Sequence, residues 1–154
     1  MLFALAIFGV GLATVGQWAS EIAHRDREAT LLRTADQIIG AIRSYYRVSP
    51  GTVHRLPANW SDLLEDRRFV GTVRHLRQVP RDPLTRERDW VVIRDAGGAM
   101  IGIHSASSST PLAQVPVRVA GLTLSPVAHY SDWQFVYDPA SDGTTPAPTA
   151  GLVQ

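Results

Sequence analysis

The first twenty positions of the chain are predominantly apolar. Residues 1–20 carry no charged side chain, and the first charge is Glu21. As a helix rising about 1.5 Å per residue, such a stretch spans roughly 30 Å, the thickness of the hydrocarbon core of a membrane. A cleaved signal peptide would need a basic residue before the apolar stretch, and a soluble core helix would need a polar stripe. The pattern therefore favours a membrane helix over these two alternatives.

An amphipathic pattern follows without a break. Apolar residues recur at spacings of four, three, four and three, which places them on one face of a helix. Pro50 and Gly51 predict the end of this helix near Val48. We therefore expect one helix over 1–48, with residues 21–48 as its amphipathic continuation. The predicted stripe is Leu31, Ala35, Ile38, Ile42 and Tyr45.

Shorter elements are expected downstream, in a globular domain over 49–138. Residues 57–64 read as a short helix with Asn59 as its N-cap. Two β-branched segments flanking Asp95-Ala96-Gly97-Gly98 predict a hairpin, and the alternation over 133–137 predicts a third strand. Residues 67–80 show no clear periodicity and are expected to form a loop, with a helical turn as the open alternative. Residues 105–132 are expected to form a long connection, and the Pro-rich tail 139–154 is expected to be disordered. The fold class is thus α+β, a long N-terminal helix packed on a small antiparallel sheet of about three strands.

Composition narrows the classes of function. The chain has 154 residues, a formal net charge of +1 and no cysteine. A charge so close to zero argues against binding nucleic acid by bulk electrostatics, and the lack of cysteine excludes disulfides, zinc thiolates and a cysteine nucleophile.

Motifs for catalysis are weak. The five histidines include no pair at i,i+4 spacing, and neither a metalloprotease motif nor a nucleophile elbow occurs. Turn and strand-edge positions account for Asp82, Asp89, Asp95 and Asp132, and solvation accounts for the arginines around His75. We expect no catalytic residue, and we expect Trp60, Trp90 and Trp133 to be core aromatics.

Several segments occur in the order and spacing of a known family. They are the apolar start that continues into an amphipathic helix, the paired tyrosines of Ile42-Arg43-Ser44-Tyr45-Tyr46, the segment from Leu56 to Leu64, Arg81-Asp82-Pro83-Leu84-Thr85, Asp89-Trp90 through Arg94-Asp95, Ile101 to Ser105, and Tyr130-Ser131-Asp132-Trp133. In these the chain resembles the type II secretion pseudopilins, relatives of the type IV pilins, and in particular their G-type, major-pseudopilin-like branch. The similarity extends nearly to Pro139.

This resemblance implies a pilin-like fold and a non-catalytic structural subunit of a secretion pseudopilus. It implies a single-pass inner-membrane protein with a periplasmic domain, a homo-oligomeric fibre, and contacts with other pseudopilin subunits and the inner-membrane platform. The residues expected in the membrane and assembly helix are Leu2, Phe3, Leu5, Ile7, Phe8, Gly9, Val10, Gly11, Leu12 and Val15. Those expected to pack the helix on the sheet are Leu31, Ile38, Ile42, Tyr45, Trp60, Trp90 and Trp133, and the family-like loop motif is Arg81, Asp82 and Pro83.

The chain departs from the family pattern in two respects. The basic leader, Gly-Phe junction and early glutamate of the family are missing around Met1, so we expect either that they are encoded upstream or that the processing site has been lost. We favour the first, because the arginines after residue 20 would otherwise draw the domain toward the cytoplasm. Calcium, typical of the branch, is not expected, since 105–131 contain no Asp or Glu.

Two alternatives share this architecture. One is a minor pilin of a type IV pilus, and the other is a membrane-anchored periplasmic protein that does not assemble, with or without an activity of its own.

Overall fold

One long helix organises the molecule. The computed structural model describes residues 2–87, 90–113, 115–119 and 121–140, with side chains from residue 21 onward. Helix α1 runs from Leu2 to Arg47, 46 residues, or roughly 70 Å at 1.5 Å per residue. It ends where Pro50 and Gly51 predicted, and Gly51 has the positive φ of 82° that glycine adopts readily.

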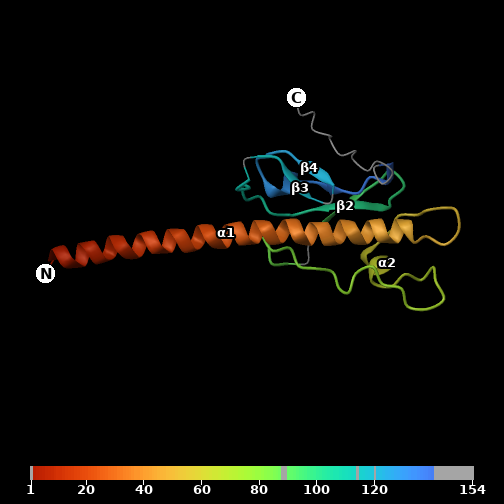
Figure 1. Cartoon of the computed structure of the whole chain (residues 1–154), viewed down its shortest axis with the longest axis horizontal. Helices are drawn as coiled ribbons and strands as arrows, with labels where there is room; N and C mark the ends of the chain where they lie inside the picture. The colour runs from red at the N-terminus through yellow and green to blue at the C-terminus, as the bar shows by residue number, and fades with distance from the viewer. Residues whose placement is uncertain (1, 88–89, 114, 120, 141–154) are drawn as a thin grey trace, which may run out of the picture.

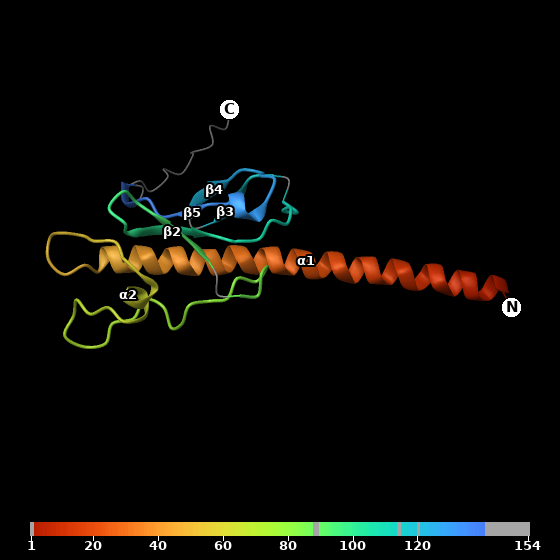
Figure 2. The same ribbon diagram turned by 180° about the vertical axis from the view of Figure 1, so that it is seen from behind.

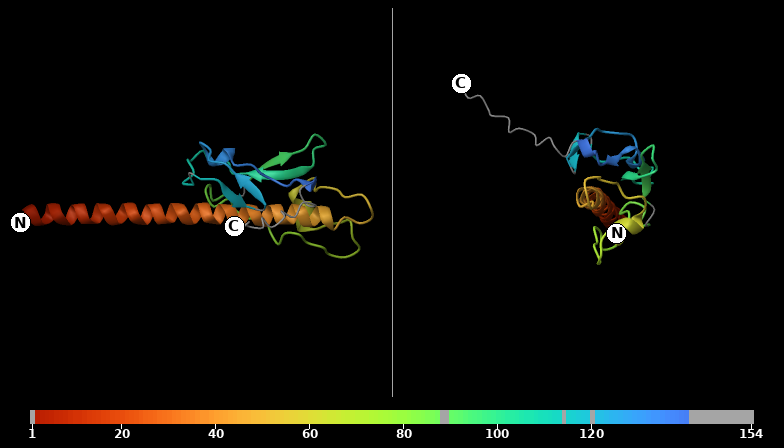
Figure 3. Two further views of the ribbon diagram at one scale, coloured as in Figure 1. Left: turned by 45° about the horizontal axis from the view of Figure 1, so that its top comes forward. Right: turned by 90° about the vertical axis from the view of Figure 1, so that its right-hand side faces the viewer.

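The rest of the chain gathers along the C-terminal half of α1. The β-strands lie on one side of it and α2 with its flanking loops on the other, while the N-terminal half extends beyond them (Figures 1 and 2). Seen along its axis, α1 has one flank uncovered (Figure 3), and Arg33, Asp36, Gln37 and Gly40 are exposed.

Two small antiparallel sheets contribute the strands. β1 (Val91–Arg94) and β2 (Met100–His104) form the predicted hairpin, and β5 (Phe135–Val136) pairs with the other edge of β2. This three-stranded sheet and the long helix confirm the coarse α+β class. A second hairpin, β3 (Val117–Val119) and β4 (Leu122–Leu124), lies where a loop was predicted.

The short helix α2 (Trp60–Leu64) follows the predicted N-cap. The Asp62 carboxylate accepts hydrogen bonds from the backbone N–H groups of Asn59, at 3.0 Å, and of Ala58, at 2.8 Å. It thus satisfies donors that a helix start leaves unpaired. The described residues between α2 and β1 are irregular, apart from a bridge between Asp66 and Val73. A short 3₁₀ helix follows much later in the chain, at Tyr130–Asp132.

The core forms where α1 meets the strands. The amphipathic stripe of α1 is buried together with Ile39 and Ala41, and it packs with Met100, Ile103, Trp133, Phe135 and Tyr137. Trp133, Phe135 and Tyr137, predicted to share one face, are all buried. Burial of these apolar side chains is the main force that holds the domain on α1.

The expected localisation needs correction. Among the described residues, no helix is both long enough and apolar enough to cross a membrane, and this finding contradicts a single-pass inner-membrane protein with a periplasmic domain. In the part of α1 with described side chains, charged residues recur from Glu21 to Arg47, and each would be costly in hydrocarbon.

Candidate functional site

A polar cluster joins the C-terminal end of α1 to the loop after α2. Asp66 is buried in this loop and forms a two-pronged ion pair with Arg68, from Nε to Oδ1 at 2.8 Å and from Nη2 to Oδ2 at 2.6 Å. His75 Nε2 lies 3.2 Å from the same Oδ2. The bidentate geometry is the strong form of an arginine–carboxylate contact.

Arg68 also caps the helix. Its Nη2 donates to the carbonyl oxygen of Tyr45 at 2.8 Å, its Nη1 donates to Ser49 Oγ at 2.7 Å, and its guanidinium carbon lies 3.5 Å from the centroid of the Tyr45 ring. A cation at the C-terminus of a helix compensates both the unpaired carbonyl groups and the negative end of the helix dipole. Asp66 thereby fixes Arg68, and Arg68 fixes the end of α1.

The electrostatics of the cluster follow from these contacts. The hydrogen bonds from Arg68 lower the pKa of Asp66 to about 2, against the opposing effect of burial. The same ion pair raises the pKa of Arg68. Burial raises the pKa of the Tyr45 phenol, and the neighbouring Arg68 charge opposes that change. The carboxylate and the guanidinium therefore both stay charged across the physiological pH range.

Three residues of this cluster are connected in the same order as the Ser-His-Asp triad of a serine hydrolase. Ser44 Oγ lies 2.9 Å from His75 Nδ1, and the other ring nitrogen of His75 contacts Asp66. In a serine hydrolase such a chain activates the hydroxyl toward a substrate. Here the His75 side chain is only 2% exposed, and the pocket at this end of the helix is lined neither by Ser44 nor by His75. The arrangement can therefore hold α1 against the loop through Ser44 and Asp66.

A second polar contact lies at the opposite end of the domain. The buried carboxylate of Glu28, on α1, accepts hydrogen bonds from the Tyr130 hydroxyl at 2.6 Å and from the backbone N–H of Leu112 at 2.8 Å. Burial, followed by the bond to Glu28, raises the pKa of Tyr130. The domain is thus tied to the helix at both ends of their contact, around Glu28 and around Tyr45.

The predicted packing residues lie in or beside the core. Leu31, Ile38, Ile42, Tyr45, Trp90 and Trp133 are buried, whereas Trp60 is half-buried at its edge. Trp60 therefore packs against the core from its edge. The side chains expected in the assembly helix lie outside the residues whose side chains are described: Leu2, Phe3, Leu5, Ile7, Phe8, Gly9, Val10, Gly11, Leu12 and Val15.

The family-like loop motif has one buried member. Arg81 is exposed and Pro83 half-buried, but Asp82 is fully buried, and its carboxylate accepts hydrogen bonds from Ser105 Oγ at 2.6 Å and from the N–H of Leu84 at 2.8 Å. This aspartate fastens the loop beneath the end of β2. Among the described residues, no group of three or more His, Asp and Glu side chains could hold a metal ion.

Sequence reasoning missed the cluster around Asp66. Its members come from three separate segments, and the residues around His75 read as a solvated basic surface. The sequence does place Asp66 two residues before Arg68. An ion pair that is exposed to solvent can have the same spacing, so this pair alone does not predict a buried contact.

Comparisons with known proteins add no relative. No family model matches the chain, and neither the curated proteins nor the solved structures gave a significant match.

Proposed function

We propose that this chain is a non-catalytic structural subunit of a pilin-type fibre, of the kind that type II secretion systems build to support protein export. The observation that carries the proposal is the length of α1 relative to the domain. Helix α1 has 46 residues, and its N-terminal half extends past the strands and loops (Figure 1).

The sequence of the extended half suits assembly between copies. Residues 1–20 contain no charged side chain and include Gly9, Gly11 and Gly16, so neighbouring helices can approach closely. Packing such helices side by side in a fibre would remove their apolar surface from water. A head-to-tail contact that does not close into a ring produces an open filament.

The two polar contacts support the same role. A domain carried on the outside of a fibre must follow the movement of its helix. The contacts at Glu28 and at Asp66–Arg68 attach the domain at both ends of the covered part of α1, in addition to the apolar core. Other subunits of the pseudopilus and its assembly platform are the partners implied by the resemblance.

Cysteine cross-linking tests assembly directly, because the chain has no cysteine of its own. A variant with both Leu5→Cys and Leu12→Cys, oxidised in the producing cells, should give a ladder of dimers, trimers and larger species. The control with Thr52→Cys and Thr72→Cys, both at exposed loop positions, should give no ladder. Monomer alone from the helix variant would refute the proposal.

Deleting the gene distinguishes a role in type II secretion from a role in a type IV pilus. A secretion subunit predicts loss of exoprotein export with twitching and transformation intact, and the reverse result would assign the chain to a type IV pilus.

A further inference from the structure

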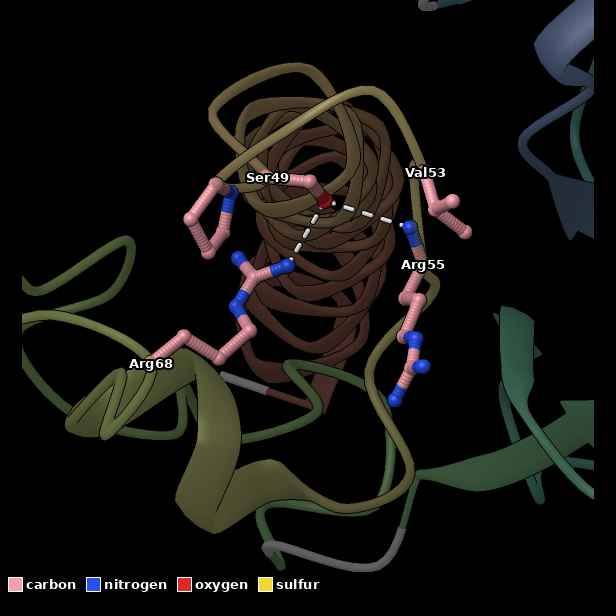
Figure 4. Close-up of a pocket in the computed structure, with 5 residues that line it drawn as sticks. Ser49, Val53, Arg55 and Arg68 are labelled. Atoms are coloured by element: carbon pink, nitrogen blue, oxygen red, sulfur yellow. Dashed lines mark hydrogen bonds between the residues drawn. The ribbon is translucent and has the colours of Figure 1, made fainter.

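A pocket of about 200 Å³ opens at the C-terminal end of α1. It is lined by Ser49, Pro50, Val53, Arg55 and Arg68, and the side chains of Arg55 and Arg68 lie on opposite sides of it (Figure 4). Ser49 links the two walls, since its hydroxyl oxygen accepts hydrogen bonds from Arg68 Nη1 at 2.7 Å and from the backbone N–H of Arg55 at 3.1 Å. No acidic residue is among the lining residues.

The guanidinium groups of Arg55 and Arg68 differ in how many N–H donors remain for a ligand. Arg68 directs four of its N–H groups to Asp66, Tyr45 and Ser49, and one N–H of Nη1 remains for another acceptor. Arg55 is exposed, and within the described part of the chain its guanidinium donates no hydrogen bond that would neutralise it. The pocket therefore offers a ligand the guanidinium donors of Arg55 on one side and one remaining N–H of Arg68 on the other.

The surroundings of the pocket are basic and partly apolar. The loops 48–59 and 65–77 contain five arginines and two acidic residues, and one of these acids, Asp66, is already paired with Arg68. Pro50 and Val53 also line the pocket, and Val53 is 64% exposed. A ligand that fits must therefore be anionic at one end and aliphatic next to its charge.

We propose that this pocket binds the carboxylate of an aspartate or glutamate side chain from an acidic protein partner. The planar fork of Arg55 matches a carboxylate, and Pro50 and Val53 pack against the methylene groups next to it. A phosphate dianion fits less well, because the negative end of the α1 dipole lies beside the pocket and only one N–H of Arg68 remains. The inference does not depend on fibre assembly, since the pocket lies at the end of α1 away from the apolar segment.

The test follows the full-length chain, kept soluble in a neutral detergent, by NMR of the Arg55 Nε–H and the Val53 amide. The probe is N-acetylglutamate α-amide, which has one carboxylate, and the comparison compounds are its neutral glutamine analogue and inorganic phosphate. We expect saturable shifts with the glutamate compound and none with the glutamine compound. Arg55→Gln should weaken binding at least about fivefold, because it removes the fork of donors.

Arg67→Gln is the matched control. Arg67 has the same charge on the same exposed loops but does not line the pocket, so its loss should change affinity less than about twofold. Equal weakening by both variants would mean general charge attraction and would overturn the site. Binding of the glutamine compound, tighter binding of phosphate, or no saturable shift would each overturn the carboxylate assignment.

Discussion

At the scale of single residues, buried charges define how the domain is attached to its helix. Asp66 and Glu28 are both buried. Asp66 accepts hydrogen bonds from Arg68, two residues further along the chain, whereas Glu28 accepts one from Tyr130, 102 residues away. Removing one partner of such a contact leaves a desolvated charge unpaired, which costs more than the contact itself contributes. The sequence alone did not show that either carboxylate is buried, because the residues around each one have the same local pattern as those around a solvated carboxylate.

Asp66 should make stability depend on acid pH. Its pKa is lowered from 3.8 to about 2 in the folded state, so its contribution is complete above about pH 4 and is lost as the pH falls toward 2. The shift corresponds to about 2 kcal/mol. Urea unfolding between pH 7 and pH 2 should show this loss in the parent chain and not in Asp66→Asn, which should already be less stable at pH 7. Asp95→Asn, in the exposed hairpin turn, should follow the parent, and an Asp66→Asn chain with the parent's pH profile would contradict the assignment.

The substitution Tyr130→Phe tests the hydrogen bond between Tyr130 and Glu28. The change removes the hydroxyl that donates to Glu28 at 2.6 Å and leaves the Leu112 N–H as the remaining donor. We expect the free energy of unfolding to fall by about 1–3 kcal/mol, the cost of a buried acceptor that loses a partner. Tyr46→Phe, at a half-buried ring with no such bond to a carboxylate, should change it by less than about 0.5 kcal/mol. Equal effects of the two variants in urea unfolding would show that the Glu28 contact contributes little.

At the scale of elements, β2 is held between two strands and tolerates little extra volume. A Cβ on Gly102 would lie 2.2 Å from the carbonyl oxygen of Phe135 and 2.9 Å from the Cα of Val136. Gly102→Ala must therefore push β5 away from β2, at a cost of about 2–4 kcal/mol. Gly40→Ala is the control, since it lies in α1 with nothing within 4 Å and should stabilise the chain by up to about 1 kcal/mol. Thermal unfolding would measure both, and an unchanged midpoint for Gly102→Ala would contradict the packing of β2 against β5.

Elements with a strong local pattern were predictable. The periodicity and the Pro50-Gly51 stop located α1, and Asn59 with Asp62 located α2. The hairpin β3–β4 was missed although valines and leucines alternate with polar residues on both sides of Gly121, whose φ is 83°. Two strands of three residues give too short an alternation to outweigh the prolines around them, and their pairing depends on the surface of α1 beneath them.

At the scale of the whole molecule, folding and assembly should be separable. Every buried residue described on α1 lies at Glu28 or beyond, so the core and both polar contacts belong to residues 21–140. A chain beginning at Glu21 should therefore keep the circular dichroism signature and the unfolding midpoint of the domain, because it loses no described core contact. The same chain should sediment as a monomer, whereas the full chain should self-associate through the uncharged residues 1–20. A shortened chain that unfolds would mean that the first half of α1 contributes to the domain itself, and a shortened chain that self-associates like the full one would place the assembly contact on the domain surface.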